Sequence, residues 1–305
     1  MIIDTHQHVF WQHKDDAGLI RDMDESHIDV AWLLSWEIPP AEDHAGYHPV
    51  LNPAHSRPDG THPGIPLADG ILARDRYPRR FILGYAPPPV LGNAPDLFQA
   101  AYEIHGVRVC GEWKFRILVD DPRCIELFRK AGELKCPVVV HLDVPYLLDE
   151  KIHVRKYQPL WYGGTIENLE RAMRACSQTH FIGHAPGFWR EVSGDADNDP
   201  AMYPKGTIAP GGKLDGLFER NPNLHADLSA GSGLGALKRD PKWARQFITR
   251  WADRLLFARD FYGRELADFL ATLELPGDVS ERIHYANAAK LVPLDNLSTR
   301  PAFSR

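Results

Sequence analysis

The sequence has no apolar run long enough to cross a membrane and no large excess of one charge. Its apolar runs are far shorter than the ~20 residues of a transmembrane helix, and Asp4 interrupts the apolar start before a signal-peptide core can form. There are 35 Lys and Arg against 41 Asp and Glu, a formal net charge of −6, which offers no basic surface for nucleic acid. We therefore expect a cytoplasmic protein without nucleic-acid or membrane partners.

Cysteine is scarce, and one familiar glycine motif is missing. Four cysteines in 305 residues, none in a C-x-x-C pair, are too few for a disulfide scaffold, so they are expected to be reduced and mostly buried. No Gly-rich phosphate turn follows the first apolar run, Met1 to Asp4. Its absence disfavours an open, doubly wound nucleotide-binding sheet, the main alternative among α/β folds.

The sequence does contain eight punctuated apolar runs of strand length, most of them followed by a stretch with helical spacing. Such alternation indicates a parallel sheet, and eight units in one chain favour an α/β fold of the (β/α)8 TIM-barrel type. The expected strands are Met1–Asp4, Val30–Ser35, Arg80–Ala86, Val107–Trp113, Pro137–His141, His180–His184, Leu224–Ser229 and Leu255–Asp260.

Residues 1–294 are expected to form a single barrel domain, followed by a C-terminal tail over 295–305. A last helix, Val279–Val292, is expected to close the bottom of the barrel. Two long Pro- and Gly-rich insertions, Trp36–Pro66 and Pro186–Gly212, follow the second and sixth strands. Loops after barrel strands lie on the C-terminal face, so both insertions are expected beside a functional site.

Histidine is abundant, with 15 residues, and ionisable side chains follow five of the expected strands. In a barrel these strand ends converge on one face, where imidazole and carboxylate groups suit zinc or a similar divalent ion. Any one of these residues could equally be a helix cap or a surface group, but six together are hard to explain that way. The six candidate ligands are His6, His8, Glu112, His141, His184 and Asp260.

Strand periodicity adds detail at the first and fourth strands. His6 and His8 are two residues apart, so their imidazoles are expected on the same side. In the fourth strand the same rule is expected to turn Cys110, Glu112 and Lys114 inward. Glu112 could then bridge two ions and Lys114 could hold an anionic substrate, or the two could form an internal ion pair.

The order of these residues resembles the amidohydrolase superfamily. The sequence has H-x-H after the first strand, an ionisable residue after the fourth, His after the fifth and sixth, and Asp after the eighth. The segment ERIHYANAAKLVPL, which contains Asn287 and Ala288, resembles the end of the amidohydrolase-related (amidohydrolase-2) branch. Two features depart from that branch: Ala258-Arg259-Asp260 stands where Gly-Ser-Asp is usual, and the first insertion is unfamiliar.

The resemblance implies a divalent metal, with zinc expected first and manganese as the alternative, bound as one or two ions. His6, His8, His141 and Asp260 would be ligands. His184 would be a catalytic acid or electrostatic group in one-metal members and a ligand of the second ion in two-metal members. Glu112 makes the two-metal form available here.

The implied activity is hydrolysis of an amide, lactone or ester-like bond of a small molecule by a metal-activated water, with Asp260 as general base. The first alternative is non-oxidative decarboxylation of an aromatic or muconate-like acid, for which Lys114, Arg116 and His184 would supply the cationic clamp and proton donor. The second is a binding barrel without catalysis, which should lack a ligand. Whether the chain forms a homo-oligomer is left open.

Smaller expectations concern residues around this centre. His44, His48, His55 and His62 in the first insertion could form a lid over an acidic or aromatic substrate, although a solvated loop is the commoner outcome. Asp227 and Ser229, at the end of the seventh strand, are expected to orient a ligating histidine.

Overall fold

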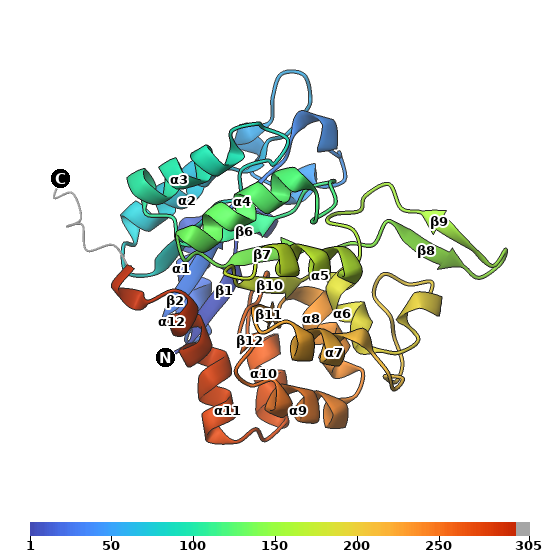
Figure 1. Cartoon of the computed structure of the whole chain (residues 1–305). Coiled ribbons are helices and arrows are strands. Elements are labelled where there is room, and N and C mark those ends of the chain that lie inside the picture. Colours follow the sequence, from blue (N-terminus) through green and yellow to red (C-terminus); the bar gives the residue numbers. More distant parts are fainter. Residues whose placement is uncertain (297–305) are drawn as a thin grey trace.

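The computed structural model describes residues 1–296, so the predicted tail lies outside the described residues apart from its first two positions. Eight parallel strands alternate with helices along the chain (Figure 1). They are β1 (Ile3–Gln7), β2 (Val30–Leu34), β5 (Phe81–Gly84), β6 (Cys110–Trp113), β7 (Val138–His141), β10 (Phe181–His184), β11 (Leu224–Asp227) and β12 (Leu255–Leu256). All eight overlap the strands predicted from the apolar runs, although β1 extends to Gln7 and so includes His6.

The eight strands pair in chain order. Ladder hydrogen bonds join β1, β2 and β5 on one side and β6, β7, β10, β11 and β12 on the other. Backbone hydrogen bonds link these two parts at both seams: Tyr85 N donates to Val109 O (2.9 Å), and Thr5 N donates to Phe257 O (3.0 Å). The strands therefore form a ring, and the predicted (β/α)8 barrel is confirmed.

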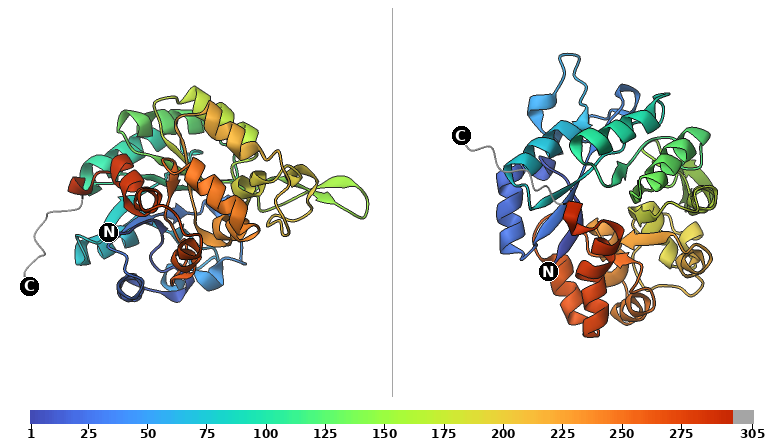
Figure 2. Two further views of the ribbon diagram at one scale, coloured as in Figure 1. Left: turned by 90° about the horizontal axis from the view of Figure 1, so that it is seen from below. Right: turned by 60° about the vertical axis from the view of Figure 1, so that its left-hand side comes forward.

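Helices surround the strands (Figure 2). They are α1 (Asp16–Glu25), α2 (Leu67–Arg76), α3 (Ala94–His105), α4 (Pro122–Glu133), α5 (Ile166–Ala175), α6 (Pro186–Trp189), α7 (Lys213–Arg220), α8 (Ala230–Lys238), α9 (Pro241–Arg250), α10 (Glu265–Thr272), α11 (Gly277–Glu281) and α12 (Asn287–Leu291). Short 3₁₀ turns occur at Trp11–His13, Pro40–Glu42, His48–Val50, Pro53–His55, Arg190–Val192, Ala196–Asn198 and Leu294–Asn296. No helix within residues 1–296 is both long and apolar enough to span a bilayer.

Helix α4 shows how the sequence fixes these outer elements. Asp121 caps its N-terminus by accepting a hydrogen bond from Arg123 N at 3.0 Å, and Pro122 occupies the first turn, where no N–H is needed. Its apolar side chains recur at helical spacing and are buried against the sheet, where Phe128 meets Phe181 edge-on at 5.4 Å. Burial of one such ring contributes about 1.5–3 kcal/mol.

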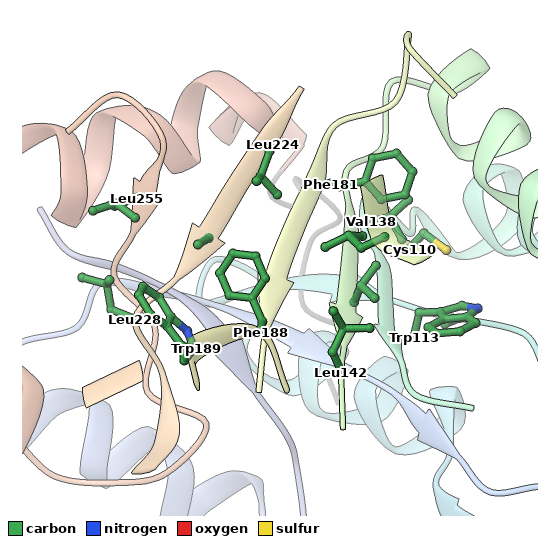
Figure 3. Packing of buried hydrophobic residues seen from close by; sticks show 14 of the residues in the cluster. Cys110, Trp113, Val138, Leu142, Phe181, Phe188, Trp189, Leu224, Leu228 and Leu255 are labelled. Carbon is green, nitrogen blue, oxygen red and sulfur yellow. The ribbon is translucent and has the colours of Figure 1, made fainter. Parts of the chain in front are cut away.

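The apolar core has an outer layer and an inner layer. The outer layer lies between strands and helices and includes Cys110, Val138 and Phe181 (Figure 3). The inner layer fills the barrel and includes Ile3, Val109 and Ile182. All four cysteines are free and buried, as expected.

The bottom of the barrel is closed by the C-terminal helices. The predicted helix Val279–Val292 is present as α11, a π-helical turn over Arg282–Ala286, and α12. Ala288 and Val292 join the inner core, and Asn287 Nδ2 donates to the carbonyls of Ala252 and Leu255 at 2.6 and 2.8 Å. The asparagine of the "NAA" segment therefore fixes the closing helix to β12.

Two small two-stranded ribbons lie outside the barrel, one in the first insertion and one in the loop after β7. In the first insertion, β3 (Trp36–Glu37) pairs antiparallel with β4 (Gly64–Ile65). Gly64 has φ +80°, and a Cβ there would lie 2.1 Å from Trp36 O, so only glycine fits. After β7, a hairpin of β8 (Tyr146–Asp149) and β9 (Val154–Tyr157) projects from the barrel (Figure 1). Neither the hairpin nor α2 was anticipated from the sequence.

A buried ion network holds α1 against the barrel. Arg259 Nε lies 2.6 Å from Asp4 Oδ2, and Arg259 Nη1 lies 2.7 Å from Asp22 Oδ2 on α1. The side chains of Arg259 and Asp4 are 4% and 0% exposed, so loss of the Arg259 charge would leave the Asp4 carboxylate buried without a cation. Arg259, a departure from the family's Gly-Ser-Asp, is thus a structural residue in this chain.

Replacement of Arg259 by Met should lower the free energy of unfolding by about 3–5 kcal/mol, because the Asp4 carboxylate would be left buried without its cation. Urea denaturation measures the change. As a control, Asp278→Asn breaks an exposed pair with Arg282 and should cost less than about 1 kcal/mol. Equal losses in the two variants would contradict this role for the Asp4–Arg259 pair.

Candidate metal centre

The six side chains predicted as ligands come together at the C-terminal ends of the strands. Three groups of three have ligand atoms within 4.8 Å of one another: His6, His8 and Glu112; His6, His184 and Asp260; and Glu112, His141 and His184. Most of these side chains are buried, and Asp260 is 16% exposed. The arrangement can hold one divalent ion or two, with Glu112 common to two of the groups.

His6 and His8 lie side by side, as their spacing predicts. Their Nε2 atoms are 3.3 Å apart, and both face Asp260, whose Oδ1 lies 4.0 Å from His6 Nε2 and 3.5 Å from His8 Nε2. The pairing of β1 with β2 shifts in register between Asp4 and Gln7. Asp4 can therefore point outward to Arg259 while Ile3 and His6 both belong to the barrel interior.

The periodicity argument for the fourth strand was partly wrong. Cys110 packs in the outer layer against the helices, and Val109 lies inside the barrel, the reverse of the expected orientation. The register of β6 against β7 shifts between Cys110 and Trp113, which reverses the alternation. Trp113 therefore faces the helices, as Cys110 does (Figure 3). Glu112 reaches the site as expected, but it does not share a side with Cys110.

Asp227 orients two of the imidazoles. Its Oδ2 accepts from His6 Nδ1 and its Oδ1 from His184 Nδ1, each at 2.9 Å. Ser229 Oγ donates to the same Oδ1 at 2.7 Å. With Nδ1 protonated in both rings, the Nε2 lone pairs of His6 and His184 face the centre, as metal ligation requires. The expectation that Asp227 and Ser229 support a histidine agrees with this geometry.

A backbone carbonyl orients the third imidazole. His8 Nδ1 lies 2.7 Å from Leu34 O, which can only accept, so Nδ1 carries the proton and Nε2 is free. His141 is held differently: its Nδ1 lies 2.6 Å from Glu112 Oε1 and its Nε2 3.1 Å from Asp143 Oδ2. Three fixed Nε2 atoms and two carboxylates that converge in a buried space are the donor set that a divalent ion prefers, so these residues fit the implied metal.

Mutual attraction among these groups outweighs the cost of their burial. Burial alone would raise the pKa of Asp227, but His184 and His6 hold it well below its usual value. Burial opposes the charged form of His184 as well, yet Asp227, Glu112 and Asp260 raise its pKa to about 9. The pKa of Glu112 is lowered in spite of burial, chiefly by Lys114 and His141. The ionised carboxylates therefore attract positive charge to the centre, whether from a protonated imidazole, from Lys114 or from a metal ion.

Asp260 has an unusual backbone conformation. Its φ is +48°, in the left-handed region that non-glycine residues seldom adopt. Two hydrogen bonds hold it there: Asp260 N donates to His6 O at 2.9 Å, and Trp11 Nε1 donates to Asp260 O at 3.2 Å. The carboxylate is thereby directed toward the imidazoles rather than along the strand.

A cavity of about 470 Å³ opens beside the centre. His141, Asp143 and Asp260 border it, with aromatic walls that include Trp11, Tyr47, Tyr203, Phe261 and Tyr262. Sequence reasoning missed Trp11, Tyr47 and Tyr203, because they lie in loops without periodicity. Tyr47 comes from the first insertion and Tyr203 from the second, so both insertions reach the cavity as expected.

The two predicted substrate-binding cations occupy different positions. Lys114 borders the cavity, with Nζ 3.9 Å from the centre of the Trp36 ring and 5.3 Å from that of Tyr162. No carboxylate oxygen of residues 1–296 lies within 4.0 Å of Lys114 Nζ, so Lys114 forms no close ion pair there. Arg116 lies against Tyr162 and does not line the cavity. Its buried Nε and Nη2 atoms have no hydrogen-bond partner within residues 1–296.

The histidines of the first insertion form hydrogen bonds and ion pairs within the insertion and with α2. His48 pairs with Asp43 at 2.8 Å, His55 pairs with Asp69 at 2.7 Å, and His62 hydrogen-bonds Asn52 O at 2.8 Å. His44 Nδ1 accepts from Gly46 N at 3.1 Å. None of the four lines the cavity, so the proposed lid of histidines is not what this loop presents to a substrate.

No protein-family model matches the chain, and no curated protein matches it significantly in sequence. Solved structures do match in fold. One is a dihydroxybenzoic acid decarboxylase from Polaromonas sp. JS666 with bound manganese and the inhibitor 2-nitroresorcinol: TM-score 0.59, 17% identity, and coverage of 97% of this chain and 98% of that one.

Two further structures are similar over nearly the whole chain. A 5-carboxyvanillate decarboxylase from Sphingomonas paucimobilis has a TM-score of 0.57 and 16% identity, and a probable 2-pyrone-4,6-dicarboxylic acid hydrolase from Acinetobacter baumannii, solved with citric acid bound, has 0.53 and 12%. Each match covers 95% of this chain and 98% of the other. The likeness shows a shared barrel fold and agrees with the amidohydrolase resemblance of the motifs.

Replacement of Asp227 by Asn should weaken metal affinity by about 10–100-fold, because an amide cannot accept from both imidazoles and leaves their orientation unset. Titration with Zn²⁺ or Mn²⁺ against a competing chelator measures this affinity. Asp215→Asn, on the surface of α7, is the matched control and should leave affinity unchanged. Unaltered affinity in the Asp227 variant would show that Asp227 does not orient ligands.

Proposed function

We propose that the protein is a metal-dependent enzyme of the amidohydrolase superfamily that hydrolyses an amide, lactone or ester-like bond of a small, carboxylate-bearing molecule. The observation that carries this proposal is Glu112, whose Oε2 lies 3.5 Å from His8 Nε2 and whose Oε1 lies 3.5 Å from His184 Nε2. A carboxylate between two sets of imidazoles suits a bridging ligand of two ions. Two-ion sites are a common arrangement for hydrolysis.

His6, His8, Glu112 and Asp260 would hold one ion, and Glu112, His141 and His184 the other, with zinc or manganese as candidates. When bound, such ions lower the pKa of a water molecule and polarise a carbonyl or carboxylate oxygen. Asp260 borders the cavity and has a partly exposed carboxylate, so it can accept a proton from water and return it to the leaving group. Its hydrogen-bonded backbone keeps the carboxylate in position for both transfers.

Lys114 and the aromatic walls act on the substrate. The Lys114 ammonium borders the cavity and forms no close ion pair with a carboxylate of residues 1–296, although it attracts Glu112 at longer range, and it rests on Trp36 and Tyr162. It is therefore placed to bind a carboxylate of the substrate. Tyr47 and Tyr203 cover a planar or apolar substrate body and exclude water, which strengthens charge interactions at the centre.

Non-oxidative decarboxylation of an aromatic acid is the second candidate. Lys114 favours it, because the same cation that anchors a carboxylate can hold the group that leaves as CO₂. Two of the solved structures described above are decarboxylases of aromatic acids. The two reactions differ in products: hydrolysis adds water to the substrate, and decarboxylation releases CO₂ without consuming water.

Protein isolated without chelator should contain about two divalent ions per chain, and Glu112→Gln should contain about one, since an amide bridges ions poorly. Elemental analysis gives the count. Glu126→Gln, on the exposed face of α4, is the matched control and should retain two. One ion in both the wild type and the Glu112 variant would favour decarboxylation, and no ion after incubation with Zn²⁺ or Mn²⁺ would exclude metal catalysis.

Lys114→Met should weaken binding of benzoate by at least about tenfold, because the carboxylate loses its counter-ion while the side-chain volume is retained. Calorimetric titration measures the affinity, with Lys242→Met on the exposed face of α9 as control.

A turnover screen of lactones, amides and aromatic acids in ¹⁸O-labelled water then separates the reactions. Label in the product indicates hydrolysis, and CO₂ release without label in the organic product indicates decarboxylation.

A further inference from the structure

A second cleft, of about 330 Å³, adjoins the catalytic cavity. It lies between the second insertion and helix α8, and four residues line both spaces: Tyr203, Gly231, Gly235 and Lys238. The cleft is therefore a side chamber of the cavity and not a separate surface feature. None of the six candidate metal ligands lines it.

The cleft is lined by four cationic side chains and by no Asp or Glu: Arg190, Lys205, Lys238 and Arg239. Lys238 pairs with Glu265. The other three form no ion pair within 4.0 Å of a carboxylate in the described residues 1–296. Glu191, Asp199 and Asp197 attract Arg190 at longer range, which leaves Lys205 and Arg239 as the less compensated pair. In a protein with a formal net charge of −6, such cations at one concavity suit a binding site for an anion.

Hydrogen bonds to backbone carbonyls fix both arginines in place, but they do not use all of the N–H donors of either guanidinium. Arg239 donates from Nε to Gly206 O at 2.9 Å and from Nη2 to Thr207 O at 3.1 Å. Arg190, only 4% exposed, donates to the carbonyls of Ala196 and Asp199. Each guanidinium keeps a buried Nη1 without a hydrogen-bond partner within residues 1–296. These donors have unmet capacity, and backbone carbonyls do not neutralise their charge.

Tyr203 stands where the cavity and the cleft meet. The residue is 53% exposed, but partial desolvation of the hydroxyl, with Asp143 and Asp260 nearby, raises its pKa to about 12, so the hydroxyl is a neutral donor near these carboxylates. Beside it, a Cβ at Gly231 or Gly235 would meet no atom within 4 Å. The surface of α8 is therefore open along the passage, and a ligand can extend past Tyr203 from one space into the other.

We infer that the substrate is elongated and carries two anionic groups: a near carboxylate at Lys114 beside the metal centre and a far anionic group in the cleft, at Lys205 and Arg239. This inference rests on the proposed function and adds the shape and charge of its substrate. Two unconnected anion sites would not need common lining residues, whereas a single extended ligand explains the shared wall at Tyr203, Gly231 and Gly235. Carboxylate and phosphate are the two chemistries that suit the far group.

Straight-chain diacids from propanedioate to decanedioate, each compared with the monoacid of equal length, test this inference by calorimetric titration of manganese-loaded protein at fixed ionic strength. Some long diacid should bind at least about tenfold more tightly than its monoacid, whereas propanedioate should gain nothing from its second carboxylate, since it cannot reach the cleft. The length of highest affinity reports the distance between the two anionic groups. Inorganic phosphate should compete with the far end only.

Lys205→Gln together with Arg239→Gln should abolish the gain of the long diacid and leave monoacid affinity unchanged. Lys205→Gln alone, at an exposed position, should reduce the gain in the same direction, and it guards against misfolding of the double variant. Lys242→Gln with Arg245→Gln on α9 removes the same charge elsewhere and is the matched control.

Three results would overturn the inference: equal affinity of diacids and monoacids at every length, a gain that survives in the double variant, or phosphate binding at the cleft without any dependence on diacid length. The last would indicate a separate effector site. Metal content, measured on the same samples, keeps the two proposals distinct. Absence of metal binding would contradict the enzyme function, while the diacid series, repeated on metal-free protein, would still report on a cleft that lies outside the ligand set.

Discussion

The paired hydrogen bonds from His6 and His184 to Asp227 are the interaction on which the rest of the site depends. One carboxylate on β11 reaches imidazoles on β1 and β10, so it joins strands that are distant in sequence. Burial alone would favour the neutral carboxyl group, yet attraction to the two imidazoles keeps Asp227 ionised. Its charge in turn directs both Nε2 atoms to one point. Without this orientation, the converging histidines would be a buried polar cluster rather than a ligand set.

The surrounding barrel must hold these charged groups close together. Glu112, Asp227 and Asp260 concentrate negative charge within the mouth, and that charge is held only where rigid strands fix each group against its partner. The Asp4–Arg259–Asp22 network stabilises the segment before Asp260 from the helix side, and Asn287 fixes the closing helix to the same strand. Residues outside the ligand set, among them Asp4, Asp22 and Asn287, therefore help to determine whether the ligands meet.

Much of this could be predicted from the sequence, because barrel topology is encoded in strand periodicity and strand ends. The eight runs, the six candidate ligands and the supporting role of Asp227 follow from residue type and position alone. The orientation of Cys110 does not, because a register shift in β6 reverses the alternation, and a shift depends on pairing with β7. Tyr47 and Tyr203 were missed for a related reason: loops carry no period, so only the folded chain shows which of their side chains reach the cavity.

In the proposed enzyme, the two insertions decide which molecule the barrel chemistry acts on. The first provides Trp36 and Tyr47 around Lys114, which suits a carboxylate attached to a planar body. The second provides Tyr203 and the cationic cleft behind it, which suits a further anionic group at a distance. A metal centre of imidazoles and carboxylates can assist several reactions, so its ligands alone do not select a substrate. Selection follows from the spacing of cations that the two loops hold in place, and that spacing is a property of this chain.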